Sequence, residues 1–360
     1  MKIVLLVDSL GFGGAQRQIV NLAIELKKGG HDIHFIRYRN DDFFLPLLSA
    51  NGIKPINIDE KNLCLRALKI RKTIRSILPD IVISFLDSPN FYASLATIGK
   101  HHWKLINSER LANESSFVNR KTKIIKSIQA RYADIIVCNS KCAENLWRKY
   151  YLKYETKFTT IYNVMEIPDY PSVTRDDGKC RILVAARYEP VKNITGMIRA
   201  VTLLTQNEKN KLEIHWYGNE NHIVNAVSER ETAMHMVKEN HLENCVFLHS
   251  ATDTIYELIA ETDFVGLFSF MEGLPNSIIE GMYLNKPIVM SKVSDYRVLV
   301  DESNGYLCNP KNDNDIADAL RKAINTSSDD RKKMGLVSHE KICRQCSRDV
   351  LMKQWNDMIN

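Results

Sequence analysis

Residues 264–290 read FVGLFSFMEGLPNSIIEGMYLNKPIVM and combine two apolar runs with a glycine-containing loop and an amphipathic segment. The runs at 264–268 and 287–290 have the length and composition of buried parallel strands. Between them, Gly273 permits a close approach of the backbone, and Pro275 suits a first helical turn. A strand, a glycine turn and a helix N-terminus together form a geometry that binds phosphate groups. This stretch therefore predicts one β-loop-α-β unit of a parallel α/β sheet, with an anion site at the start of the helix.

Two carboxylates, Glu272 and Glu280, lie eight residues apart within this stretch. Glu272 falls in the loop, whereas Glu280 lies two turns into the amphipathic segment, where it could accept hydrogen bonds from two hydroxyls of a ribose. Asn276 and Ser277 can cap free N–H groups at the helix start. The spacing of the glutamates alone is uninformative, since it recurs by chance, and the alternative is a loop with a solvated helix face. The full string, Glu-Gly-Leu-Pro-Asn and then Glu-Gly-Met after a strand, is specific and favours a nucleotide site.

The string resembles the Glu-x7-Glu signature of retaining glycosyltransferases of family 4, which have the GT-B fold. The resemblance implies that Glu272 lies near the transferred sugar and that Glu280 holds the nucleotide ribose. It also implies a donor-binding segment at the helix start, made of Gly273, Leu274, Pro275, Asn276 and Ser277.

Strand-then-helix alternation runs through the chain in two series, which predicts two parallel sheets covered by helices. Between the series, residues 166–179 contain two prolines and an Asp-Asp-Gly triplet, as is typical of a linker. With the resemblance, this pattern predicts an α/β protein of the GT-B fold, with two Rossmann-like parallel-sheet domains facing across a cleft. The acceptor-binding domain is expected over 1–165 and the nucleotide-sugar-binding domain over 180–337. We expect residues 338–360 to form a C-terminal helix that packs back on the first domain.

Several charged residues follow the strand predicted at 181–186, where residues 187–193 read RYEPVKN. Cations just beyond the carboxyl end of a strand can face the crevice in which open sheets bind ligands, and two phosphates need such charge. The string resembles the donor-diphosphate loop of the family, and the resemblance assigns that role to Arg187 and Lys192. The alternative for this spacing by itself is a surface salt bridge.

Near the N-terminus, SLGFGGAQR at 9–17 follows a predicted strand and opens a predicted helix. It departs from the dinucleotide-binding fingerprint, because Gln16 stands where the third glycine should fall and no acid follows the second strand at the usual place. The string instead resembles the Gly-Gly-Ala-Glu-Arg element of the family, with Gln16 in place of the glutamate. The resemblance implies that Gly13 and Gly14 approach the donor across the interdomain cleft. A purely structural turn is the alternative.

Polar residues follow two predicted strands of the first domain, as ISFLD at 83–87 and NSER at 107–110. These strings resemble a subgroup of the family that extends lipid-linked oligosaccharides in bacterial envelope synthesis. The resemblance places Asp87, Glu109 and Arg110 on the acceptor side of the cleft. Many relatives carry a histidine against the transferred sugar near this point, whereas this chain has Arg110, so the identity of the sugar stays open.

The formal net charge of +6 is unevenly distributed along the chain. Residues 1–165 contain 26 Lys and Arg against 14 Asp and Glu, or +12, and the remainder contains 23 against 29, or −6. Much of the excess falls in 61–78 and 117–132. The segment 117–132 predicts an amphipathic helix that meets an anionic membrane surface or a lipid diphosphate, and the alternative is a core-packed helix with a solvated basic face. The expected contact residues are Arg120, Lys123 and Lys126.

No apolar run approaches the roughly 20 residues of a transmembrane helix, and the apolar run at the N-terminus is too short for a signal peptide. The eight cysteines show no metal-ligand spacing, which favours reduced thiols in a cytosolic protein. We therefore expect a cytoplasmic protein that is peripheral on the inner face of the plasma membrane.

Together, these features predict an enzyme that moves a hexose or N-acetylhexosamine from a nucleotide diphosphate sugar, in the first instance a UDP-sugar. The expected acceptor is a hydroxyl of a polyprenyl-diphosphate-linked glycan in surface polysaccharide biosynthesis, such as O-antigen or capsule. The family implies retention at the anomeric carbon, with Glu272, Arg187 and Lys192 as catalytic residues. Because no Asp-x-Asp site falls in a convincing loop, we expect no metal, and we expect no other cofactor and no nucleic-acid partner.

Two other classes of protein remain open. A nucleotide-sugar epimerase or a phosphorylase would use the same fold, the first without an acceptor and the second with inorganic phosphate. A non-catalytic glycan- or lipid-binding relative would be expected to lack at least one of four residues, all of which are present, namely Glu272, Glu280, Arg187 and Lys192.

Overall fold

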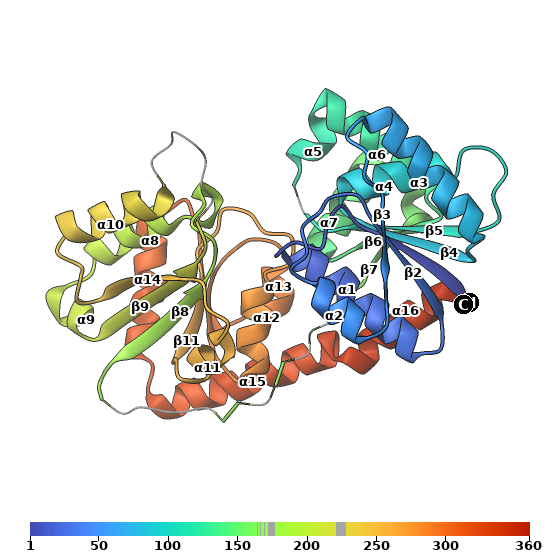
Figure 1. Ribbon diagram of the computed structural model, residues 1–360. Coiled ribbons are helices and arrows are strands. Elements are labelled where there is room, and N and C mark those ends of the chain that lie inside the picture. The colour runs from blue at the N-terminus through green and yellow to red at the C-terminus, as the bar shows by residue number, and fades with distance from the viewer. Residues whose placement is uncertain (112, 164, 166, 169, 172–176, 221–227) are drawn as a thin grey trace. The chain divides into compact units, whose positions relative to one another are not determined.

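The computed structural model describes residues 1–360 except 112, 164, 166, 169, 172–176 and 221–227. The chain divides into two compact units, whose helices and strands carry the labels in Figure 1. Unit 1 comprises residues 1–165 and 348–360, and unit 2 comprises 166–347. Each unit is an α/β body built on one parallel sheet, which confirms the predicted fold class. The linker predicted over 166–179 lies in part outside the described residues.

The seven strands of unit 1 are parallel and lie in the order β3-β2-β1-β4-β5-β6-β7. The central strands are runs of buried aliphatic residues, as expected where helices cover both faces of a sheet. In Figure 1, α3, α4 and α6 cover one face, and α1 lies against the other. The strands are β1 (Lys2–Leu6), β2 (Asp32–Arg37), β3 (Pro55–Asn57), β4 (Ile81–Phe85), β5 (Lys104–Glu109), β6 (Ile135–Cys138) and β7 (Phe158–Thr160). The helices are α1 (Gly14–Lys28), α2 (Leu45–Ala50), α3 (Leu63–Ile77), α4 (Asp87–Ala96), α5 (Ser115–Val118), α6 (Arg120–Tyr132), α7 (Lys141–Tyr150) and the short η1 (Leu152–Lys157).

The C-terminal segment is divided between the two units. The sequence predicts one helix over 338–360, whereas the structure has α15 (Ser328–Cys346) in unit 2 and a separate α16 (Arg348–Ile359) in unit 1. The break comes at Ser347, whose extended backbone ends α15. Helix α16 is anchored on unit 1 by an ion pair and by Trp355, whose ring stacks on Phe85 with centroids 6.4 Å apart. The returning helix is therefore shorter than predicted.

Unit 2 has six parallel strands in the order β10-β9-β8-β11-β12-β13. Helices α8, α10 and α14 bury one face of this sheet, and α12 packs between the sheet and α15 (Figure 1). The strands are β8 (Cys180–Ala185), β9 (Leu212–Gly218), β10 (Val246–Ser250), β11 (Phe264–Leu267), β12 (Ile288–Ser291) and β13 (Gly305–Cys308). The helices are the short η2 (Pro190–Lys192), α8 (Ile194–Thr202), α9 (Gln206–Asn210), α10 (Glu229–Glu239), α11 (Ile255–Ala260), α12 (Asn276–Tyr283), α13 (Tyr296–Leu299), α14 (Asp313–Asn325) and α15.

The glycine of the Glu-Gly-Met string has a packing role in unit 2. A Cβ added to Gly281 would lie 2.6 Å from Cγ2 of Val265 on β11, which is closer than two carbons can approach. Gly281 therefore lets α12 lie close against its strand, and this fixes the position of the preceding Glu280.

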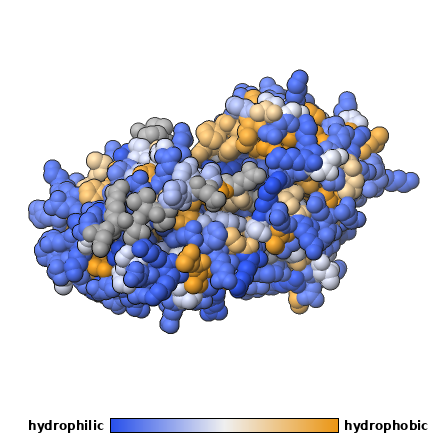
Figure 2. Space-filling view, turned by 90° about the horizontal axis from the view of Figure 1, so that it is seen from below, coloured by the Kyte–Doolittle hydropathy of each residue, from blue (hydrophilic) through white to orange (hydrophobic). Residues whose placement is uncertain are grey.

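Parallel strands place all their carboxyl ends along one edge of the sheet, where ligands of open α/β sheets bind. In unit 1 this edge carries the loops after β1, β2, β4 and β5, and in unit 2 it carries those after β8 and β11. On the face drawn in Figure 2, hydrophilic residues predominate and apolar residues form separate groups. Among the described residues, no helix is long and apolar enough to cross a membrane.

Candidate functional site

In unit 2, the loops after β8 and β11 meet through an ion pair. Lys192 Nζ lies 2.7 Å from Oε1 of Glu272, and the hydroxyl of Ser269 donates to the same oxygen at 2.6 Å. The two charged side chains are only 17 % and 11 % exposed. The sequence predicted both residues from separate motifs, and the structure brings them into contact.

A residue that the sequence analysis did not assign fixes these two loops. Asn193 is buried, with a left-handed φ of 60°, and its amide donates to the carbonyls of Phe268 (3.1 Å) and Pro310 (2.9 Å). The backbone N–H of Phe270 also donates to the carbonyl of Val191 at 2.8 Å. Asparagine tolerates positive φ better than most residues, so Asn193 both turns the chain and ties the loops together. Its place directly after Lys192 and before a helical pattern was the available signal.

The start of α12 has the predicted strand-loop-helix geometry. The helix begins at Asn276, and Pro275 is its N-cap residue, one position earlier than the first turn predicted for it. Pro275 has no side-chain group that can accept a hydrogen bond from the first turn, and its carbonyl accepts the backbone N–H groups of Ile278 (3.1 Å) and Ile279 (3.3 Å). The hydroxyl of Ser294 donates to the carbonyl of Gly273 and steadies the loop. Leu274 is largely buried beside it.

Two further residues predicted for the donor side, Glu280 and Arg187, have other partners than Lys192 and Glu272. Glu280 is buried in the second turn of α12, and the hydroxyl of Tyr256 on α11 donates to it at 3.4 Å. Arg187 is 56 % exposed and forms an ion pair with Glu189 at 2.8 Å. The surface salt bridge weighed as the alternative for Arg187 is therefore present.

In unit 1, the predicted acceptor residues form one buried cluster with a lysine. Lys126 Nζ lies 2.6 Å from Oδ1 of Asp87 and also contacts Oε2 of Glu109. Lys126 is 1 % exposed, so it cannot present its charge to a membrane, and its assignment to the membrane surface is wrong. Arg120 and Lys123, by contrast, are exposed. Burial acts to lower the pKa of Lys126, but the neighbouring Glu109 and Asp87 outweigh it and raise that pKa, which keeps the ammonium charged.

Every oxygen of the Glu109 carboxylate is occupied by protein groups. Oε1 accepts the backbone N–H groups of Arg110 (3.1 Å) and Leu111 (3.3 Å), and Oε2 accepts the indole N–H of Trp147 at 3.2 Å besides Lys126. Glu109 is therefore an anchor of the cluster rather than an open acceptor. Of the two carboxylates, Asp87 is the one with substantial exposure, at 47 %.

The guanidinium of Arg110 is held by unit 1. It contacts Oδ1 of Asn163, donates to the hydroxyl of Ser108 at 3.3 Å and lies over the ring of Phe85 at 4.6 Å. Burial lowers the pKa of Arg110 to about 9, although Glu109 acts in the opposite direction. Arg110 directly follows Glu109, the last residue of β5, and so lies at the carboxyl edge of the sheet.

The contacts of the loop after β1 give a reason why this chain has Gln16 where the family's Gly-Gly-Ala-Glu-Arg element has a glutamate. Gly13 is the N-cap residue of α1, and Gly14 is the first residue of the helix. Nε2 of Gln16 donates to Oδ1 of Asp8 at 3.1 Å. A glutamate at 16 could not donate this bond when ionised and would repel the Asp8 carboxylate, which is why an amide suits the position.

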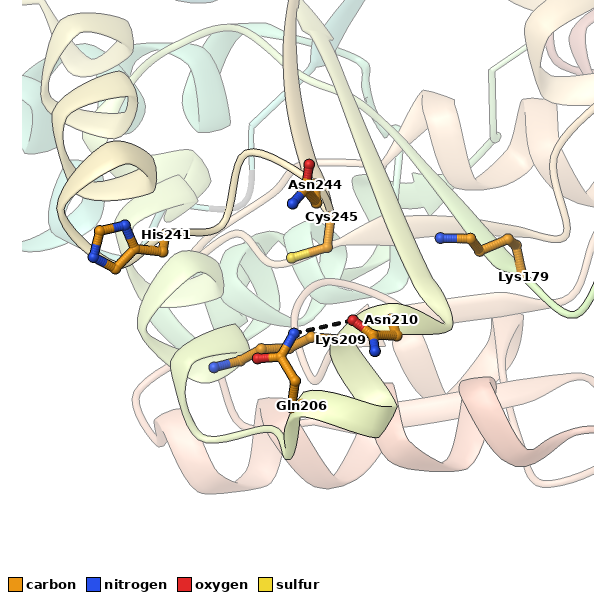
Figure 3. A pocket seen from close by; sticks show the side chains of 7 residues that line it. All are labelled: Lys179, Gln206, Lys209, Asn210, His241, Asn244 and Cys245. Carbon is orange, nitrogen blue, oxygen red and sulfur yellow. Dashed lines mark hydrogen bonds between the residues drawn. The ribbon is translucent and has the colours of Figure 1, made fainter.

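A separate cavity of about 200 Å³ lies at the opposite edge of the unit 2 sheet (Figure 3). It is formed where β8, β9 and β10 begin, whereas the predicted donor residues follow the ends of strands. It therefore does not belong to the candidate site. Its lining residues are Lys179, Gln206, Lys209, Asn210, His241, Asn244 and Cys245.

Known families and proteins resemble this chain over almost its full length. Residues 12–167 match the model described as Glycosyltransferase Family 4, and residues 169–337 match that of Glycosyl transferases group 1. An N-acetylgalactosamine-N,N'-diacetylbacillosaminyl-diphospho-undecaprenol 4-alpha-N-acetylgalactosaminyltransferase of Campylobacter jejuni is 24 % identical over 340 residues, 89 % of each chain. A GalNAc-alpha-(1->4)-GalNAc-alpha-(1->3)-diNAcBac-PP-undecaprenol alpha-1,4-N-acetyl-D-galactosaminyltransferase of the same species is 23 % identical and covers 100 % of this chain and 98 % of its own.

Among solved structures, Anabaena HepE in complex with UDP and glucose is similar in fold, with a TM-score of 0.82 at 16 % identity. The match covers 100 % of this chain and 99 % of the other. This likeness supports the two-unit α/β architecture derived above.

Proposed function

Since this chain is a glycosyltransferase that belongs to family 4, we propose that it transfers a hexose or N-acetylhexosamine from a UDP-sugar to a lipid-linked glycan. The observation that carries the proposal is the contact between Lys192 and Glu272 beside the N-terminus of α12. In this contact, Lys192 is the cation proposed to bind the donor diphosphate and Glu272 is the carboxylate proposed to meet the sugar, and both lie at one edge of the sheet. The HepE structures hold UDP, and the Campylobacter relatives are named for undecaprenol-linked glycans, which supports this choice of donor and acceptor.

The reaction needs stabilisation of the negative charge that develops on the departing diphosphate. Lys192 and the N–H groups at the start of α12 are fixed donors and supply positive potential there before the reaction begins. Arg187 is exposed enough to leave Glu189 and join them when a diphosphate arrives. Glu280, buried in α12, is suited to accept hydrogen bonds from the ribose hydroxyls.

We place Glu272 against the transferred sugar, and the reaction proceeds with retention at the anomeric carbon. Ser269 and Lys192 hold its carboxylate in one orientation, so the side chain needs little rearrangement to meet a sugar hydroxyl. Charge compensation by protein groups makes a divalent cation unnecessary in this scheme.

The decisive experiment is a transfer assay with a panel of UDP-sugars and polyprenyl-diphosphate-linked glycan acceptors. The expected result is acceptor-dependent release of UDP, a product with the anomeric configuration of the donor sugar by NMR, and full activity in EDTA. Isomerisation of the donor without an acceptor would indicate an epimerase, and strict dependence on inorganic phosphate would indicate a phosphorylase. UDP-sugar binding with no turnover on any acceptor would favour a non-catalytic relative.

We also propose that the enzyme works at the cytoplasmic face of the plasma membrane, in the synthesis of a surface polysaccharide. The support is the +12 charge of residues 1–165 and the exposure of cations along α6. With Lys126 buried, the surface cations of this helix include Arg120, Lys121 and Lys123. Next to them, Ile124 is 59 % exposed, and a basic surface with protruding aliphatic groups suits an anionic lipid headgroup layer.

A further inference from the structure

The last turns of α15 carry a histidine and two cysteines that have no part in the site described above. His339, Cys343 and Cys346 follow one another at intervals of four and three residues, so they lie close together on the helix surface. Helix α15 packs along α12 (Figure 1). A Cβ added to Gly335 would lie 2.0 Å from the carbonyl oxygen of Asn285, so this glycine lets α15 approach the end of α12 closely.

The contact with α12 fixes the tautomer of His339. Tyr283 is the last residue of α12, so its carbonyl has no hydrogen-bond partner within the helix. Nδ1 of His339 lies 2.7 Å from this carbonyl oxygen. Because a carbonyl oxygen can only accept, Nδ1 carries the proton, and in the neutral ring Nε2 is left as an acceptor.

The acceptor nitrogen of His339 faces the thiol of Cys343, with 3.3 Å between Nε2 and Sγ. The thiol therefore donates to a ring that a third group orients, which is the arrangement of an activated nucleophile. Both residues are partly exposed, so a small molecule can reach the sulfur. Burial raises the pKa of Cys343, so the sulfur is a thiol at pH 7 and needs a base in contact with it to react.

We propose that Cys343 is a site of reversible thiolation by low-molecular-weight disulfides, with His339 as the base that takes its proton. The Cys343 sulfur forms a bond to one sulfur of the disulfide while Nε2 of His339 takes the thiol proton. The S–S bond of the reagent breaks, and its electron pair leaves with the second sulfur, which receives the proton from His339. One thiol is consumed and one is released, so the disulfide is itself the oxidant. The inference stands on unit 2 alone and does not rest on the proposed function.

Cys346 does not resolve the mixed disulfide. It is buried, and burial raises its pKa to about 12, with Asp295 and Cys343 acting in the same direction. Because the thiolate is the form that attacks a disulfide, Cys346 stays reduced and the added group persists until an outside thiol removes it. Tyr283, whose hydroxyl donates to the Cys346 carbonyl at 2.5 Å, is neutral at pH 7 because burial raises its pKa. Neither Tyr283 nor Asp295 supplies positive charge to the two sulfurs.

The test is the rate at which dithiodipyridine labels each cysteine of the full chain at pH 7, read from the release of thiopyridone and from peptide mapping by mass spectrometry. Exposed Cys64 on α3 is the reference thiol. Cys343 is expected to react about tenfold or more faster than Cys64, because general-base assistance of about 100-fold or more outweighs its raised pKa and partial burial. Buried Cys308 of the same unit should stay unlabelled, which shows that the protein is folded.

The variant His339→Asn separates a chemical role of the histidine from a structural one. The asparagine amide can still donate to the Tyr283 carbonyl but cannot act as a base. Cys343 of this variant should react at least about tenfold more slowly than in wild type. Its rate should rise about tenfold per pH unit below pH 9, as for an unassisted thiol, whereas the wild-type rate should rise less steeply.

The variant Tyr283→Phe is the control for loosened packing, since it removes only the hydroxyl bond to Cys346, and it should react at Cys343 as wild type does. The inference is overturned if Cys343 reacts no faster than Cys64, if His339→Asn reacts at the wild-type rate, or if Tyr283→Phe slows the reaction as much as His339→Asn does. A Cys343–Cys346 disulfide in place of the mixed disulfide would also overturn it.

Discussion

At the scale of single residues, the ion pair of Lys192 with Glu272 links two motifs that lie 80 positions apart in the sequence. The residue types and loops were predictable, because each motif follows an apolar strand and precedes a helix. Their contact was not, because it depends on Asn193, whose positive φ and two carbonyl partners bring the loops together. We expect substitutions of Lys192 and of Glu272 to have different effects on UDP binding.

Lys192→Ala should weaken UDP binding about 10- to 150-fold, since a charged hydrogen bond to phosphate contributes about 1.5–3 kcal/mol. Isothermal titration calorimetry measures this change directly. Arg199→Ala is the matched control, because Arg199 is an exposed cation of the same unit and pairs with Asp313 away from the loop. Unchanged UDP affinity in Lys192→Ala would rule out its diphosphate role.

Substitution of Glu280 should mainly affect UDP binding, whereas substitution of Glu272 should mainly affect the rate of transfer. Glu280→Gln is expected to weaken UDP binding by about tenfold or more, because a ribose hydroxyl then loses a charged acceptor. Glu272→Gln should keep UDP affinity within about twofold and lower the rate of transfer, as expected for a group that acts on the transferred sugar. Calorimetry and initial rates on the same preparations provide both numbers. Equal losses of UDP affinity in the two variants would contradict the assigned roles.

At the scale of elements, the charge pattern of α6 led to one wrong prediction, the assignment of Lys126 to the membrane surface. The segment is rich in lysine, but Lys126 shares its buried face with Gln129 and Ala130 and bonds to Asp87 at the start of α4. The acidic partners come from the start of α4 and the end of β5, 39 and 17 positions before Lys126, and only the folded chain reveals them. A buried lysine with two carboxylates is a structural feature of the unit, whatever the acceptor is.

Lys126→Met should therefore destabilise the protein by about 3–5 kcal/mol, because it leaves two carboxylates close together without their cation. Urea unfolding followed by circular dichroism reports the loss. Lys123→Met on the exposed side of the same helix is the control and should change stability by no more than about 0.5 kcal/mol. Similar small effects in both variants would show that the buried cluster is energetically unimportant.

At the scale of the whole molecule, α16 closes unit 1 with residues from the far end of the chain. Arg348 pairs with Glu25, which is 8 % exposed. Burial acts to raise the pKa of Glu25, but the hydrogen bonds from Lys28 and Arg348 outweigh it and hold the pKa below its ordinary value of 4.5. A lowered folded pKa means that the pair stabilises the fold above pH 4.5 and that this contribution is lost as the pH falls through the folded value.

Arg348→Gln should lower the melting temperature at pH 7 by an amount equivalent to up to about 1 kcal/mol, since Lys28 still compensates part of the charge. The difference from wild type should shrink as the pH is lowered below 4.5, the ordinary pKa of the carboxyl. Arg344→Gln, which breaks an exposed pair with Glu340 on α15, serves as control. A difference that grows toward acid pH would exclude this linkage.

The charge asymmetry of the chain predicts reversible membrane association. Wild-type protein should sediment with anionic vesicles at low salt and be released at high salt, because screening acts over about 8–10 Å at physiological ionic strength. The triple change of Arg120, Lys121 and Lys123 to Ser should release it. The same loss of three charges at the exposed Lys332, Lys333 and Arg344 of α15 should not. Wild-type protein that stays in the supernatant at low salt would favour a soluble acceptor.

The sequence by itself determined the parallel α/β architecture, the family and the loops that carry the candidate site. Those features are local, since apolar strands, glycine turns and helix starts are set by neighbouring residues. Only the tertiary structure decided that Lys192 meets Glu272, that Lys126 is buried between Asp87 and Glu109, and that the C-terminal segment breaks at Ser347. These depend on which distant side chains share a low-dielectric interior, where a charge is stable only beside its partner. Such partners cannot be read from spacing along the chain.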